Sequence, residues 1–209
     1  MTEHLETLSR GIAYRWLAQF FLCPPALETY CNPEGQAFLS SCKTLPELAP
    51  CARLLEDMTA PTTDLEAAQA RLTRAHNKAF AVGSSLSAPL YASVYLSERG
   101  LLFQQPARDM NRLLAKLGLS VPGTLNEPPD HLGIQLQVAA ELCDRALSGN
   151  PCPVTAAHFL GDYVLTWLPH LLERCATQKE ATLIVPFVRA ALSLAQSDAA
   201  LASDRKQAV

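Results

Sequence analysis

One short segment holds most of the candidate chemistry of this chain: Glu127-Pro128-Pro129-Asp130-His131, directly before a long apolar stretch. An acidic side chain in the first turn of a helix complements the positive end of the helix dipole, so Asp130 has a structural explanation. The imidazole of His131 can donate to a carboxylate or cap a neighbouring carbonyl. The same two groups can also serve as a binding site, and their residue types alone leave both roles open.

An enzymatic use of Asp130 and His131, as the acid–base pair of a small hydrolase, is the weaker alternative. Adjacent residues on a helical turn point about 100° apart, so these two do not readily form an oriented dyad, and no nucleophile is marked nearby. The motifs G-x-x-x-x-G-K-[ST], G-x-G-x-x-G, H-E-x-x-H and G-x-S-x-G are missing, and no two histidines stand four residues apart. We therefore predict no catalytic residue, no metal site, no cofactor and no enzymatic activity.

Composition predicts an all-α fold, a helical bundle. Leu and Ala supply 66 of the 209 residues, whereas Val and Ile supply 12, and helices favour the first pair while strands favour the second. The formal net charge of −3 gives no electrostatic footprint for nucleic acid. No apolar run approaches the roughly 20 residues of a membrane span, and the first residues lack the positive charge of a secretory leader. We expect a cytoplasmic protein with no stable membrane association.

The cysteines are predicted to be reduced thiols, most of them in the core. Seven occur at irregular spacings, without a C-x-x-C pair. An odd number and the missing pairs argue against a disulfide framework and against structural zinc.

Proline, glycine and capping residues indicate where the helices of the first half begin and end. Asn32 precedes a helix that starts at Pro33, Thr63 opens another with a capping box, and a third runs from Pro106 to Gly118. Between 81 and 105 the helical period blurs, which predicts short helical turns. The first helix, about 4–21, is expected to bury one stripe at spacings of three and four: Leu5, Leu8, Ile12, Trp16 and Phe20.

The second half is predicted to hold three further helices. The first spans about 129–147, the second starts at Pro153 and kinks or breaks at Pro169, and the last opens with the capping box Thr177-x-x-Glu180. The pattern of this last helix is interrupted at Pro186.

Residues 119–129 contain consecutive turn signals and separate the helices into two groups. We predict an N-terminal lobe at 1–118, a hinge at 119–129 and a C-terminal lobe at 130–209. A linker of this length can lie on the surface of a monomer or extend into a second copy, so a monomer and a domain-swapped homodimer both remain open.

Four segments, in order, resemble the TorD/DmsD/NarJ family of maturation chaperones for molybdenum-cofactor oxidoreductases. The Trp-Leu-Pro sequence and the chain length look most like the TorD branch, which serves trimethylamine N-oxide reductase. One departure is Gln135, four residues after His131, where the family often has glutamate. The segments are Arg10-x3-Tyr14 through Phe21-x2-Pro24-Pro25, Ala88 through Tyr95, Glu127 through Leu132, and Phe159-x7-Trp167-Leu168-Pro169.

The resemblance implies that the protein binds the apoprotein and the twin-arginine signal peptide of a molybdoenzyme precursor and delays export until the cofactor is inserted. A carboxylate suits the planar guanidinium of arginine, so we expect Asp130 and His131 to face outward and meet the polar part of the leader. Apolar residues are expected to contact the rest of it. A helical scaffold for unrelated partners is the other alternative. The predicted peptide-binding residues are Asp130, His131, Glu127, Pro128, Leu90, Tyr91, Tyr95 and Trp167.

Overall fold

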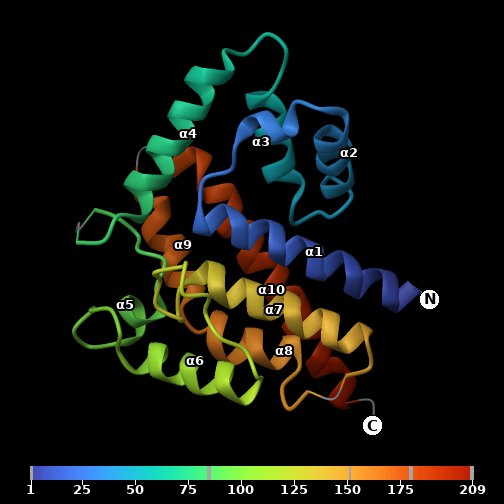
Figure 1. Ribbon diagram of the computed structural model, residues 1–209, viewed down its shortest axis with the longest axis vertical. Helices are drawn as coiled ribbons and strands as arrows, with labels where there is room; N and C mark the ends of the chain where they lie inside the picture. Colours follow the sequence, from blue (N-terminus) through green and yellow to red (C-terminus); the bar gives the residue numbers. More distant parts are fainter. Residues whose placement is uncertain (1, 84–85, 151, 179–180, 208–209) are drawn as a thin grey trace.

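The structure, a computed structural model, describes residues 2–83, 86–150, 152–178 and 181–207, with side chains described between 9 and 200. Within these ranges the chain is all-α, as predicted, and its only strand-like pairing is an isolated bridge between Tyr91 and His131. The α-helices, in chain order (Figure 1), are α1 (Thr2–Leu22), α2 (Pro33–Cys42), α3 (Ala49–Met58), α4 (Leu65–Phe80), α5 (Ala92–Leu96), α6 (Gln105–Lys116), α7 (Leu132–Leu147), α8 (Ala156–Phe159), α9 (Leu168–Ala176) and α10 (Val185–Gln207). Two short 3-10 helices, η1 (Leu27–Tyr30) and η3 (Ala181–Leu183), and a single-turn π-helix, η2 (Leu160–Val164), join them.

The helices α1 and α7 pack side by side and antiparallel at the centre of the molecule (Figure 1). A Cβ added to Gly133, at the start of α7, would lie 2.6 Å from Leu22 Cγ at the end of α1. Near the other ends of the two helices, a Cβ on Gly11 would lie 3.4 Å from Cys143 Cβ. Gly133 therefore permits a close approach that a larger residue would prevent.

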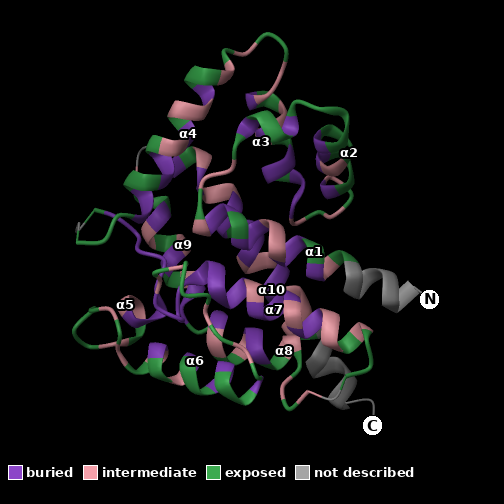
Figure 2. Ribbon diagram, in the orientation of Figure 1, coloured by how far each residue is buried: buried purple, intermediate pink, exposed green. Residues whose placement is uncertain are grey.

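A single hydrophobic core includes residues from both sides of 119–129. Phe20 of α1 stacks on Phe187 of α10 with their rings 3.6 Å apart, and Leu136 of α7 belongs to the same buried cluster. Helix α10 also packs against α3, α8 and α9. In Figure 2 the buried residues follow this central set of helices and the segments 87–91 and 128–131, whereas the other loops are largely exposed. The lobe boundaries remain a prediction.

Several predicted helix ends are confirmed. The Asn32 side chain accepts a hydrogen bond from Gly35 N at 2.7 Å, and Pro106 lies in the first turn of α6. Gly118 follows the end of α6 with φ of +67°, a conformation that favours glycine. Pro169 coincides with a break, because α9 begins at Leu168 after the π-helical turn.

Other predicted positions are wrong by one to three residues, because neighbouring residues offered more than one possible cap or start. The cap of α4 is Asp64 rather than Thr63, and it accepts from Ala67 N at 3.0 Å. Helix α8 begins at Ala156, capped by Thr155, instead of at Pro153. Pro186 lies in the first turn of α10 and does not interrupt it.

The predicted stripe of α1 is correct at its far end and wrong at Ile12. Phe20 is buried and Trp16 packs against the core, but Ile12 is 44% exposed. The side chains of Leu5 and Leu8, and Glu180, lie outside the described residues. Thr177 does not open the last helix as predicted, because it ends α9 and α10 begins at Val185.

A polar cluster, called here the α1–α10 latch, joins the first and last helices. It consists of Arg10 and Tyr14 of α1, Glu47 before α3, and Ser197 and Asp198 of α10. Tyr14 Oη donates to Asp198 Oδ2 at 2.5 Å, Arg10 pairs with Glu47 and Asp198, and Ser197 Oγ donates to Glu47. The resembling segment Arg10-x3-Tyr14 thus serves to hold α10 on α1.

Candidate functional site

The segment Glu127–His131, called here the signature turn, is held against residues 90–93. Leu132 N donates to Leu90 O at 2.8 Å, and Ala92 N donates to Asp130 O at 3.2 Å. These bonds form the short antiparallel bridge between Tyr91 and His131. Two segments far apart in the sequence therefore form one small unit at the start of α7.

Asp130 lies inside this unit, and the prediction that its carboxylate faces outward is wrong. Its exposed fraction is 0%, and Oδ2 accepts a hydrogen bond from Ser93 N at 2.7 Å. Because α5 has no side-chain cap of its own, Asp130 caps that helix from across the bridge. Its second oxygen, Oδ1, has no hydrogen-bond partner among the described residues.

His131 is also buried, with 4% of its surface exposed, so its predicted outward position is likewise wrong. Its Nδ1 accepts from Gly133 N at 3.1 Å, which makes His131 the cap of α7, and its ring packs edge-on against Tyr91. Burial, with a smaller contribution from His76, lowers the pKa of His131 to about 4. The imidazole is therefore neutral at pH 7.

The other predicted residues of this unit surround the bridge. Tyr91 Oη donates to Glu127 Oε2 at 2.6 Å, and burial together with this carboxylate raises the pKa of Tyr91. Leu90 and Pro128 are buried. Glu127 is half-buried, so it is the acidic residue of the signature turn that reaches the surface.

Tyr95 and Trp167 stack with their rings 5.4 Å apart, so the fourth resembling segment, 159–169, joins the same region. Trp167 is fully buried, and its Nε1 donates to Gln135 Oε1 and to Tyr163 O, each at 3.1 Å. Gln135 Nε2 donates to Tyr163 O at 3.2 Å. Gln135 therefore acts as donor and acceptor at once, which an ionised glutamate does not.

A cavity of about 300 Å³ lies beside the signature turn, between α5, α6, α7 and η2. Sequence reasoning missed its polar residues, because α6 and η2 are brought together only by packing. The signal available was Gly161-Asp162, a glycine and an acid inside an otherwise apolar helical pattern. The lining residues are Ala92, Leu96, Pro106, Asp109, Met110, Gln135, Asp162, Tyr163 and Thr166.

Metal sites, disulfides and membrane-spanning helices are absent from the described part of the chain. There, no group of three or more His, Cys, Asp or Glu side chains is arranged to hold a metal ion. All seven cysteines are free, and burial raises the pKa of Cys42, Cys143 and Cys175 to about 12. Four of the seven are buried, as predicted for most of them, whereas Cys152 is half-buried and Cys23 and Cys31 are exposed. None of the described helices is both long and apolar enough to span a bilayer.

The fold and the site define a helical binding protein. Asp130 and His131 are already occupied by backbone N–H groups, and they face different helices rather than each other. No catalytic role is needed to explain either residue, because each caps a helix. The cavity beside them offers carboxylates and apolar walls, which suit recognition of a ligand.

Comparison with known proteins identifies the family. The family model described as "Nitrate reductase delta subunit" matches residues 42–173. A protein of Vibrio cholerae (strain O395) is 32% identical over 95% of this chain and 94% of its own length, one of Vibrio parahaemolyticus is 30% identical over 79% and 81%, and one of Psychrobacter sp. is 29% identical over 86% and 85%. Each is named "Chaperone protein TorD". The chain belongs to this family, the TorD/NarJ family of chaperones. That membership confirms the resemblance and the prediction of a non-enzymatic protein.

Proposed function

We propose that this protein is a cytoplasmic chaperone for a molybdenum-cofactor oxidoreductase, with trimethylamine N-oxide reductase as its client. It binds the apoprotein and the twin-arginine signal peptide of the precursor, and it delays export until the cofactor has been inserted. The relatives support the chaperone role by their printed name, and the TorD branch is the one that the sequence resembles most.

The observation that carries the proposal is the convergence of three resembling segments at one place. Residues 88–95, 127–132 and 159–169 meet through the Tyr91–His131 bridge, the Tyr91–Glu127 hydrogen bond and the Tyr95–Trp167 stack. An exposed cavity adjoins them. Sequence elements that are separated along the chain but assembled around one surface suit a shared binding role better than independent packing roles.

We assign two roles to the predicted peptide-binding residues. Glu127 and Tyr95, which are partly exposed, contact the leader. The buried residues Asp130, His131, Pro128, Leu90, Tyr91 and Trp167 hold the contacting elements in place. Asp130 is a positioning residue, since it fixes the start of α5 through Ser93 N.

Titration of a fluorescently labelled leader peptide tests the function directly. We expect saturable binding of the trimethylamine N-oxide reductase leader, weakened by added salt because the leader is cationic. A leader with both arginines replaced by glutamine is the matched control and should bind at least tenfold more weakly. Equal affinity for the two peptides contradicts recognition of the twin arginines, and binding of neither peptide contradicts the proposed leader binding.

Co-purification tests the client. The chaperone should retain the cofactor-free precursor and lose it once the cofactor is inserted. Retention of unrelated proteins in place of any molybdoenzyme precursor would favour the scaffold alternative.

We further propose that the protein forms monomers and homodimers by exchange of segments across 119–129. The linker makes few bonds of its own, among them the turn from Leu125 N to Pro122 O, whereas α7 packs along α1 over most of its length. The same α1–α7 contact can therefore form within one chain or between two. Sedimentation at several concentrations should show a dimer whose fraction increases when the linker is shortened, because a shorter linker closes less easily within one chain. An unchanged monomer contradicts the proposal.

A further inference from the structure

The cavity beside the signature turn has apolar walls and a polar side. Met110 and Pro106 of α6 and Ala92 and Leu96 of α5 form the walls, and Asp109 and Asp162 provide two carboxylates. A volume of about 300 Å³ is at the lower end for ligand pockets. It has room for a side chain and its close neighbours but not for a whole peptide.

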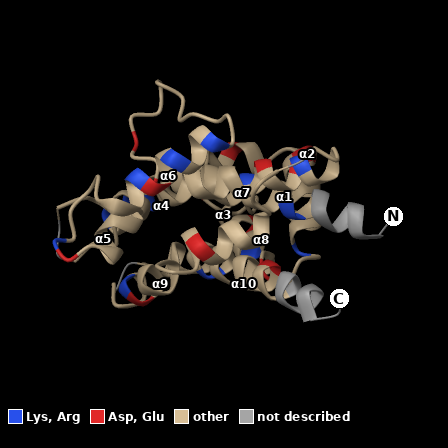
Figure 3. Cartoon of the chain, turned by 90° about the horizontal axis from the view of Figure 1, so that it is seen from below, with Lys and Arg blue, Asp and Glu red and all other residues tan. Residues whose placement is uncertain are grey.

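The charge of the cavity favours a cation. Asp109 forms an ion pair with Arg112 and accepts a hydrogen bond from Gln105 Nε2. Asp162, in contrast, has no ion pair among the described residues. Burial, followed by Asp109 and Asp162, raises the pKa of Tyr163, and Arg112 opposes this only in part. Figure 3 shows acidic and basic residues interspersed along α6. The cavity therefore keeps one carboxylate that the protein itself does not neutralise.

The position of Asp162 depends on the π-helical turn η2. Leu165 N donates to Leu160 O at 2.8 Å, the five-residue spacing of a π-helix. The widened turn leaves Tyr163 O to the side chains of Gln135 and Trp167, which both donate to it. Single π-helical turns occur frequently at functional sites, and this one is braced by two buried side chains. Asp162 is thus held in place rather than on a mobile loop.

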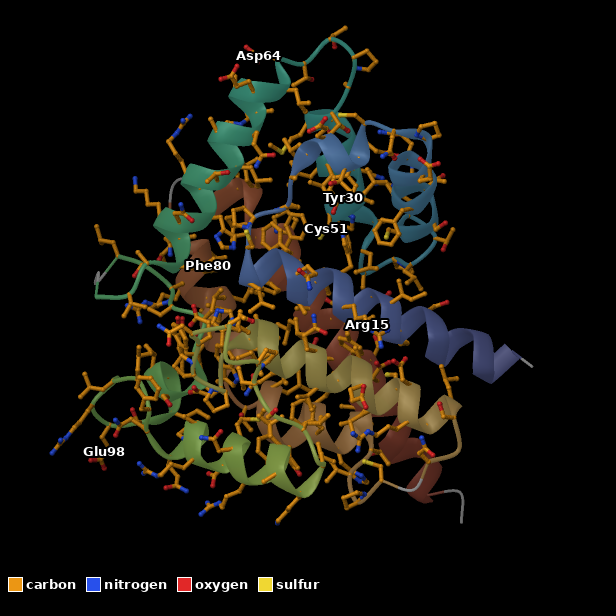
Figure 4. All side chains as sticks on the ribbon, in the orientation of Figure 1. Arg15, Tyr30, Cys51, Asp64, Phe80 and Glu98 are labelled. Atoms are coloured by element: carbon orange, nitrogen blue, oxygen red, sulfur yellow. The ribbon has the colours of Figure 1, made fainter. Side chains whose placement is uncertain are left out.

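Exposed apolar residues lie at the end of α5 and on the loop that leads from it to α6, between the cavity-lining residues Leu96 and Pro106. Leu96 is 46% exposed, Leu101 53% and Phe103 65%. Gln104 N donates to Ser93 Oγ at 3.2 Å, which ties the end of this loop to the start of α5. Figure 2 shows the loop as largely exposed, and Figure 4 shows Glu98 at its outer edge.

Phe103 is unfavourable for the folded protein by itself. Its φ is +58°, the sole non-glycine value above zero among the described residues. A bulky residue in this conformation is strained, and an exposed ring returns little of that free energy through burial. Neither the backbone nor the core requires a phenylalanine here, so a binding role explains the residue better.

We propose that this cavity binds one arginine of the leader, with the guanidinium against Asp162 and Asp109, while Phe103 and Leu96 cover the neighbouring apolar side chain. The inference rests on the proposed function and adds the subsite. A guanidinium beside an apolar residue matches both chemical halves of the surface, whereas an acidic or purely apolar segment matches one half at most. Ala92 and Gln135 line the cavity, and Ala92 also bonds to Asp130 of the signature turn. The subsite is therefore continuous with the unit built around that turn.

Leader titrations with paired variants test the subsite. Asp162→Asn should lower the affinity for the leader about fivefold to tenfold and reduce the salt dependence of binding, because one charge-assisted contact is lost. Asp57→Asn, on the exposed side of α3, is the matched control and should leave affinity unchanged. Asp162→Arg should abolish binding of the normal leader and restore it for a leader with glutamate in place of one arginine.

Phe103→Gly separates binding from stability. Glycine relieves the positive φ, so the unfolding midpoint should stay equal or rise, while leader affinity should fall about tenfold. Ile12→Ala removes an exposed apolar side chain on α1 and should leave leader affinity unchanged. A binding loss in a variant that is as stable as the parent cannot arise from misfolding.

The outcomes distinguish this inference from the function on which it rests. If the parent protein binds the leader and Asp162→Asn and Phe103→Gly bind it equally well, the subsite is wrong and the proposed function stands. If the parent protein does not bind the leader, both are wrong. If the control Asp57→Asn weakens binding as much as Asp162→Asn, the effect is one of overall charge and the subsite is also wrong.

Discussion

The two ends of α7 use buried polar groups in different ways. At its C-terminal end, near the α1–α10 latch, Tyr14, Arg10, Glu47 and Asp198 satisfy one another across α1 and α10. At its N-terminal end, the signature turn and its neighbours leave Asp130 Oδ1 and Tyr95 Oη without a hydrogen-bond partner among the described residues.

The difference indicates which region serves binding. A buried polar atom without a partner costs free energy, so natural proteins keep few of them and each calls for an explanation. The latch needs no explanation beyond holding helices together. The start of α7 combines unpaired buried atoms, a π-helical turn, a strained exposed phenylalanine and a cavity, features that accompany functional sites.

Replacing Trp167 should give the largest loss of stability. The ring is fully buried, and truncation of a buried tryptophan costs about 3–5 kcal/mol. Trp167→Ala should therefore lower the free energy of unfolding by about 4 kcal/mol in a urea titration. A change below about 1 kcal/mol would mean that the Tyr95–Trp167 stack and its hydrogen bonds do not organise this end of α7.

The buried histidine of the signature turn should make stability dependent on pH. His131 has a pKa of about 4 in the folded protein and about 6.5 when unfolded. The unfolded chain binds the extra proton first, so stability is fully present above pH 6.5 and falls as the pH decreases toward 4, by about 3 kcal/mol.

His131→Asn is the matched variant for this measurement. Asparagine can still accept from Gly133 N as a helix cap, but it does not titrate. Unfolding curves between pH 7 and 4 should fall less steeply for the variant than for the parent. Parallel curves would contradict a buried, neutral His131.

Gln135→Glu should destabilise the region around η2 by about 2 kcal/mol at pH 7. An ionised glutamate cannot donate to Tyr163 O and would carry an unpaired charge into a site that is 1% exposed. Burial raises the pKa of such a carboxyl group, so the loss should shrink as the pH falls and the group is protonated. Thermal unfolding at pH 5 and pH 7 measures this, and a variant equally stable at both values would contradict it.

Tyr14→Phe should have the smallest effect of the set, about 1.5 kcal/mol, because Asp198 loses one hydrogen bond but keeps its contact with Arg10. Leader affinity should be unchanged, since the latch lies at the other end of α7. Urea unfolding and leader titration of the same sample provide both values. Weakened binding without a stability change would place the latch in the binding site.

Local chemistry made much of the fold predictable. Asn32, Pro106, Gly118 and Pro169 mark helix ends through effects within a few residues, and Leu and Ala outnumber the β-branched residues. The family resemblance also singled out the segments 88–95, 127–132 and 159–169, which meet in the structure. These signals depend on neighbouring residues, so they can be recognised without knowledge of tertiary packing.

The burial of the signature turn could not be predicted in this way. Asp130 faces inward because Ser93 N, on a segment far away in sequence, needs an acceptor at the start of α5. The cavity forms where α6 meets η2, and the periodicity of either segment does not reveal that contact. Arg15, labelled on α1 in Figure 4, is a further example. It pairs with Asp144 of α7, a partner that the sequence pattern around Arg15 does not reveal.

Hydrogen–deuterium exchange of the full chain with and without the leader peptide tests the central claim most directly. We expect slower exchange in residues 90–110 and 159–167 when the leader is bound, and no change in residues 10–14 and 194–198. Slower exchange confined to the latch, or no change at the start of α7 at saturating leader, would contradict it.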